Sequence, residues 1–206
     1  YDVNAKFTHK FSDRDKLYLS AYLGDDALYA KVRTRVSYNM DFEDKDYTNL
    51  NWGWGNVVTA LRWNHVVNNK LFMNTTASFT RYRSKLGLGA ENVQTDKSKT
   101  PPKEEKSELN LTYNSGIRDW TAKMDFDYTP NSAHDIKFGT NYTYHTFRPD
   151  VTSMKFVDSE IVNKVDTVIG SPVVYAHETM SYIEDNVSIG NLLKVNLGVH
   201  FSTFHV

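Results

Sequence analysis

The chain contains no cysteine among its 206 residues. Disulfide bonds and thiolate metal sites are therefore excluded. Basic and acidic residues nearly balance, 24 against 25, which gives a net charge of -1. Because such a balance provides no overall attraction to nucleic acid or to an anionic membrane surface, we expect no nucleic-acid partner.

The sequence also lacks any run of about 18 apolar residues, and its mean hydropathy is only -0.55. These two properties exclude a transmembrane helix. They are compatible with a transmembrane β-barrel, because about half of the residues in each barrel strand are polar.

Motifs for catalysis and cofactor binding are missing as well. The seven histidines show no HExxH or comparable ligand spacing, and the patterns GxGxxG, GxxxxGK and GxSxG do not occur. The acidic residues within 41–46 could bind calcium, but their spacing is not that of an EF-hand loop, which favours a solvated loop. We therefore expect no enzymatic activity, no metal site and no cofactor.

Two runs of strict alternation between apolar and polar residues span residues 56–83. Each run has about ten residues, close to the roughly 9 to 11 that a membrane-crossing strand needs. They predict a long β-hairpin around Asn68 and Asn69. Because paired residues must share a face, we expect Trp63 to pair with Met73 and the turn to contain an odd number of residues. The same parity argument predicts an odd turn within residues 130–135.

Similar alternation recurs along the chain and predicts about eight strands. The long connections are expected at residues 27–50, 87–107 and 147–173, and they alternate with short turns. This alternation of turn lengths is typical of an outer-membrane barrel, whose extracellular loops are longer than its periplasmic turns. A change in the parity of the apolar residues predicts a bulge at Ser115 and Gly116. Outside the central hairpin, the predicted strands are residues 1–8, 17–23, 120–128, 136–145, 175–189 and 193–201.

The alternation defines two faces of the predicted sheet. Charged side chains on one face would be costly in a dry core, so we expect that face to line a wet lumen and the apolar face to contact lipid. A soluble up-and-down barrel or sandwich is the alternative, because alternation alone does not say which face is inside. The expected lumen-facing residues are Arg62, Lys123, Asp125 and Asp127. The expected lipid-facing residues are Val57, Leu61, Trp63, Leu71, Met73, Phe79, Met124, Phe126, Val195 and Val199.

Several segments resemble consecutive barrel hairpins of TonB-dependent outer-membrane receptors. The most specific are WGN...LRWNH within residues 54–65, FDYTPN...HDIKFG within 126–139, and Tyr182-Ile183-Glu184-Asp185. The resemblance is to the type whose full chains carry a carboxypeptidase-regulatory-like domain before the plug. The segments that carry it are LYLSAYLGDDAL, WGNVVTALRWNHVVNNKLFMNTTASFTRYR, DWTAKMDFDYTPNSAHDIKFGTNYTYHTFRP and YIEDNVSIGNLLKVNLGVHFS.

The resemblance implies an all-β, antiparallel up-and-down transmembrane β-barrel of twenty-two strands, of which this chain supplies about eight. Residues 1–206 would then be a partial barrel domain without a plug. It also implies location in the cell outer membrane and active uptake of a metal chelate, vitamin or glycan. The expected partners are outer-membrane lipid, the TonB system through an N-terminal part, and a surface lipoprotein. Two alternatives stay open: a complete eight-stranded barrel with a structural or adhesive role, and a soluble β ligand-binding barrel.

Overall fold

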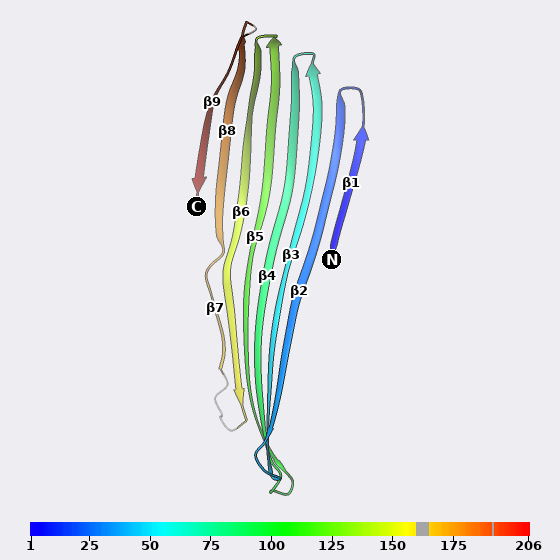
Figure 1. The fold of residues 1–206 in the computed structure, drawn as a ribbon. Coiled ribbons are helices and arrows are strands. Elements are labelled where there is room, and N and C mark those ends of the chain that lie inside the picture. Colours follow the sequence, from blue (N-terminus) through cyan, green and yellow to red (C-terminus); the bar gives the residue numbers. More distant parts are fainter. Residues whose placement is uncertain (160–164, 191) are drawn as a thin grey trace.

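The computed structural model describes residues 1–159, 165–190 and 192–206. These residues form nine strands in one antiparallel sheet of order β1-β2-β3-β4-β5-β6-β8-β9, with β7 paired to β6 (Figure 1). The predicted all-β, antiparallel, up-and-down arrangement is confirmed. The strands are β1 (Asp2–Lys10), β2 (Asp15–Ser37), β3 (Phe42–Asn68), β4 (Leu71–Asp96), β5 (Lys103–Asn131), β6 (His134–Asp158), β7 (Val165–Gly170), β8 (Val174–Ile189) and β9 (Leu193–His205).

Strands β2 to β6 are far longer than predicted, from 23 residues in β2 to 29 in β5. The expected long connections at residues 27–50 and 87–107 are wrong in extent, because strand pairing continues to the tight turns at 38–41 and 97–102. Within 147–173, β6 continues and β7 adds a ninth strand. The backbone ladder needs no apolar alternation, so it continues where the sequence pattern fades. We call these continuations of β2 to β6 the extensions.

The register of the central hairpin differs from the prediction by two residues. Trp63 pairs with Thr75, whereas Met73 pairs with His65. The predicted even sum of paired numbers is correct, but the predicted odd turn is wrong. Residues 69–70 form a two-residue turn, and a register shift between Val66 and Asn68 supplies the extra residue. The β5–β6 hairpin does the same, with turn residues 132–133 and a shift between Tyr128 and Asn131.

The predicted bulge at Ser115 and Gly116 is found at that level of the sheet, but its extra residue is on β6. Pairing of β5 with β4 is continuous there, whereas the β5–β6 register shifts: Asn114 pairs with Val151 and Gly116 with Arg148. The apolar residues of β5 therefore change face along the strand. Bulges re-aim side chains without breaking the sheet, and this one changes the register of β6.

The sheet is a single layer whose path runs from β1 at one edge to β9 at the other (Figure 1). Among the described residues, Ala176 is the one hydrophobic residue that is buried. Large apolar side chains remain open instead, for example Ile183 at 54% and Val199 at 71% exposure. Contiguous apolar surface of this kind marks a face that something else covers.

Candidate functional site

The register places all the residues predicted to contact lipid on one face of the sheet. One row runs across the strands from Met73 through Phe126, Phe138 and Ile183 to Val199. Within it, the rings of Phe126 and Phe138 stack with their centroids 4.8 Å apart. We call this surface the apolar band. That its covering is lipid stays a prediction. Of the predicted residues it contains Val57, Leu61, Trp63, Leu71, Met73, Phe79, Met124, Phe126, Val195 and Val199.

The opposite face at the same level carries the residues predicted to line a lumen, and we call it the polar face. Lys123 Nζ lies 2.9 Å from Asp125 Oδ2, and the Tyr182 hydroxyl donates a hydrogen bond of 2.9 Å to Asp125 Oδ1. Asp127 is opposite Lys137 in the neighbouring strand. The structure thus brings Lys123 and Asp125 together. Arg62 lies apart from them, separated by β4.

A second group on the polar face surrounds His145. Its Nδ1 lies 2.8 Å from Asp119 Oδ1 and its Nε2 lies 3.2 Å from Glu178 Oε2, while the His145 side chain is only 14% exposed. These residues come from β5, β6 and β8, so no local motif reveals them. The sequence signal for these residues is their alternation with apolar neighbours. Alternation predicts which face of the sheet each residue lies on, but it does not predict which residues contact one another. Such networks fix side chains that would otherwise be costly to bury.

The apolar band ends in aromatic and polar residues near the short turns. The Trp63 indole donates a hydrogen bond of 3.1 Å to Asp15 Oδ1, and His65 Nδ1 lies 2.6 Å from the same oxygen. On β6 and β8, His134 Nδ1 lies 2.6 Å from Asp185 Oδ2. Amphipathic aromatic side chains with such partners are typical of a boundary between lipid and water.

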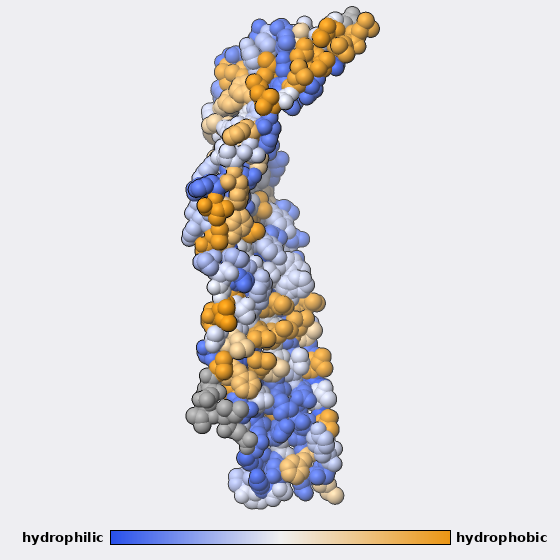
Figure 2. Space-filling model, turned by 90° about the vertical axis from the view of Figure 1, so that its left-hand side faces the viewer, coloured by the Kyte–Doolittle hydropathy of each residue, from blue (hydrophilic) through white to orange (hydrophobic). Residues whose placement is uncertain are grey.

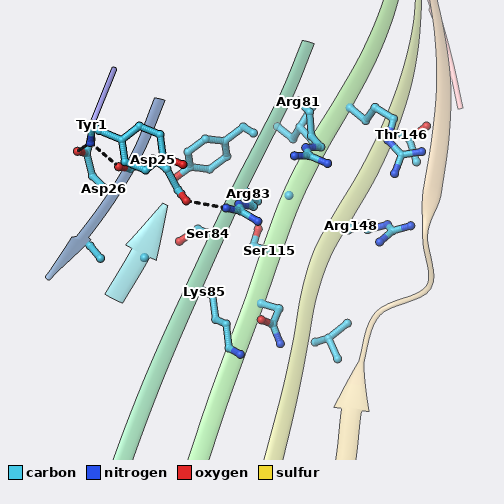
Figure 3. A pocket seen from close by; sticks show the side chains of 18 of the residues that line it. Tyr1, Asp25, Asp26, Arg81, Arg83, Ser84, Lys85, Ser115, Thr146 and Arg148 are labelled. Atoms are coloured by element: carbon cyan, nitrogen blue, oxygen red, sulfur yellow. Dashed lines mark hydrogen bonds and ion pairs between the residues drawn. The ribbon is translucent and has the colours of Figure 1, made fainter. Parts of the chain in front are cut away.

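At its other border the apolar band ends in cations. The rings of Phe79 and Trp120 lie 4.6 Å apart, and in the next row on the same face Arg81 is directly opposite Arg118. Farther along, Arg83 forms an ion pair of 2.8 Å with Asp25. Sequence reasoning missed this cluster because its members lie on separate strands. Together with Lys85 and Arg148 they surround an open hollow of about 850 Å³, the basic hollow (Figure 3).

Beyond this level the apolar surface changes to the other side of the sheet. One row of the extensions there runs from Leu50 through Leu88 and Leu111 to Met154. These residues continue the polar face, not the apolar band. The molecule accordingly shows separate hydrophobic patches along its length and a hydrophilic end (Figure 2).

Near that end, Glu43 is the most enclosed charged side chain of the extensions, at 5% exposure. Its carboxylate lies 2.9 Å from Lys97, 3.1 Å from Lys45 and 2.5 Å from Arg35. Hydrogen bonds from Lys97, Lys45 and Arg35 lower the pKa of Glu43 to about 2. This ion network connects β2, β3 and the turn at residues 97–102.

Within the predicted acidic group at 41–46, Asp44 and Asp46 accept hydrogen bonds from the amide of Asn92. No group of three or more histidine or acidic side chains suited to a metal ion occurs in residues 1–159, 165–190 and 192–206. In the same residues, no helix is long and apolar enough to span a membrane.

No protein-family model matches the chain, and no curated protein matches it in sequence. Among solved structures, it is similar to the outer membrane transporter YddB from Escherichia coli, with 8% identity over 92% of this chain and a TM-score of 0.33. The match covers 34% of that transporter, so this chain spans about a third of its length. LpxR from Salmonella typhimurium has 6% identity over 92% of this chain and 88% of its own, with a TM-score of 0.14. Neither likeness carries an argument about function.

Proposed function

We propose that this chain is part of the β-barrel of a TonB-dependent outer-membrane transporter that takes up a metal chelate, vitamin or glycan. The observation that carries the proposal is the contrast between the two faces of one single-layer sheet. The apolar band crosses β1 to β9 on one side, and ionic networks around Asp125 and His145 occupy the other. A bilayer would cover the apolar band on the first side, and a wet lumen would solvate the ionic networks on the second.

The lengths of the strands support the same assignment. A tilted strand crosses a membrane with about 9 to 11 residues, whereas β5 has 29. The excess lies entirely on the side away from the short turns, as a tall extracellular rim would require. The resemblance of the central hairpin segments to TonB-dependent receptors adds the transport class, the TonB system and a surface lipoprotein as partners.

The polar face would line the lumen or contact a plug. Lys123 and Asp125 are paired, which reduces the free energy needed to hold charge in a confined space. Arg62 has no carboxylate partner among the described residues, so it is free to contact a plug or a passing ligand. The role proposed here is transport and not catalysis, with no cofactor.

Growth assays test the proposal in the natural host. The gene is deleted, and growth is measured with a ferric chelate, cobalamin or an oligosaccharide as the limiting nutrient. We expect growth on one of these nutrients to fail, and to fail equally when TonB is deleted. A protein recovered in the soluble fraction would establish the soluble ligand-binding alternative. Normal growth on all three, with the protein in the outer membrane, would favour a structural or adhesive barrel.

A further inference from the structure

We propose that the basic hollow binds the phosphate groups of a phosphorylated lipid headgroup in the membrane leaflet next to the extensions. This inference rests on the proposed membrane location of the apolar band. It concerns the outside of the sheet, whereas transport concerns the polar face. Its starting point is the position of the cations: Arg81 and Arg118 come one row after the aromatic pair Phe79 and Trp120, on the same face.

The rows of the sheet explain how the hollow forms. Asp25, Gly55, Arg83, Gly116 and Arg148 follow one another across β2 to β6 in a single row. Gly116 lines the hollow and has no side chain, so it leaves an open position between the long cations Arg83 and Arg148, which stand on either side (Figure 3). A Cβ at Gly55 would lie 2.6 Å from Asp25 Oδ1 and 3.3 Å from Arg83 Nε, so glycine there leaves room for the Asp25–Arg83 ion pair.

The charges of the hollow are not balanced within the described residues. Arg83 is paired with Asp25, but Arg81, Lys85, Arg118 and Arg148 have no carboxylate partner in that part of the chain. Arg81 and Arg118 are directly opposite each other in the sheet. Like charges in that arrangement repel each other and destabilise the sheet. An anion between them would remove that repulsion.

Phosphate is the anion that fits this set of donors. Guanidinium groups bind phosphate oxygens through two parallel hydrogen bonds, and several arginines can share one phosphate. The hollow of about 850 Å³ is much larger than one inorganic phosphate requires. Its place at the rim of the apolar band would let acyl chains lie along Leu61 and Trp120 while the headgroup enters the hollow.

The experiment measures lipid retention by the full natural polypeptide, purified from outer membranes in detergent. Native mass spectrometry would follow the binding of bisphosphorylated lipid A and of its dephosphorylated form. We expect the double variant Arg81→Gln/Arg118→Gln to retain the phosphorylated lipid at least about tenfold less than wild type. The matched control Lys16→Gln/Lys194→Gln, on the polar face, should bind as wild type. The dephosphorylated lipid should bind wild type as weakly as it binds the Arg81→Gln/Arg118→Gln variant.

Equal retention by wild type and Arg81→Gln/Arg118→Gln would overturn the inference, provided that the variant fractionates with outer membranes as wild type does. That result would leave the proposed transport function intact. Competition by inorganic phosphate at the same concentration as the lipid would also overturn it, because the site would then recognise the free anion. Recovery of wild type in the soluble fraction would instead contradict the proposed function itself.

Discussion

Leu111 and Trp120 both lie on β5, yet they point to opposite faces of the sheet. Trp120 is opposite Phe79 in the apolar band, whereas Leu111 is opposite Leu88 in the extensions, with continuous β4–β5 pairing between them. A strand that keeps one environment on each side keeps one parity. The change of parity therefore marks the level at which the surroundings of the sheet change, and the cations of the basic hollow lie at this level.

The first prediction concerns the orientation of the apolar band. Leu61→Arg should destabilise the protein in a bilayer by about 2 to 4 kcal/mol if position 61 lies near the midplane, because an arginine there would contact lipid. Ala60→Arg, its neighbour on the polar face, should cost less if the lumen is wet. Unfolding by urea in lipid vesicles measures both values, and a larger cost at Ala60 than at Leu61 would reverse the assignment of the two faces.

The second prediction uses the absence of cysteine to test the register. Residues directly opposite in an antiparallel pair have Cα atoms about 4.5 to 5.5 Å apart, within the range of a disulfide. Trp63→Cys/Thr75→Cys should therefore form a disulfide under mild oxidation. The matched pair Trp63→Cys/Met73→Cys should not, because Met73 is opposite His65. Mass spectrometry of peptides without reduction distinguishes the two outcomes, and bridging of the second pair alone would restore the register predicted from sequence.

The predicted and observed registers of this hairpin share the same faces but differ in which residues are opposite each other. The parity of Trp63 and Leu61 follows from alternation, since one face must match across the hairpin. The bulge at Val66 to Asn68 does not follow from it, because two polar asparagines fit either a two-residue or a three-residue turn. Alternation therefore predicts which residues share a face, and the geometry of the turn decides which residues are opposite.

The extensions were missed for a related physical reason. Between Lys31 and Lys45, polar side chains occur on both faces, so period-two alternation of hydrophobicity is absent although the backbone ladder is complete. The basic hollow could not be predicted from the sequence either. Arg81, Arg118 and Arg148 come close only through the pairing of β4, β5 and β6, which no short motif records.

The third prediction concerns the ion network of Glu43. Its pKa in the folded chain, about 2, is below its ordinary value of 4.5. The charged form is therefore favoured by folding, so this contribution to stability is complete above pH 4.5 and is lost as the pH falls toward 2. A spin label at Asn39, in the adjacent turn, should become more mobile over that interval. In the Glu43→Gln variant the same spin label should already be mobile at pH 7. An identical pH response of the label in both proteins would exclude Glu43 as the cause.

The fourth prediction concerns which end of the sheet is outside the cell. Met40, in the β2–β3 turn, is 95% exposed, and the turn at residues 97–102 lies at the same end of the sheet. Protease added to intact cells should cut at these turns, because they lie at the ends of the extensions. The short turns at 11–14 and 69–70 should be cut only after the outer membrane is permeabilised. Cleavage of the short turns alone in intact cells would invert the topology.

The last prediction concerns the two edges of the sheet. β1 pairs only with β2 and β9 only with β8 among the described residues, so each leaves a row of backbone groups without a strand partner. In a bilayer such groups are costly, and a larger barrel would satisfy them with further strands. The isolated 206-residue chain should therefore aggregate in detergent, and the natural polypeptide should have a mass several times 23.7 kDa. Refolding of the isolated chain to a heat-resistant monomer, with β1 paired to β9, would establish the complete small barrel instead. Pairing of these two edges would leave no free edge to which further strands could bind.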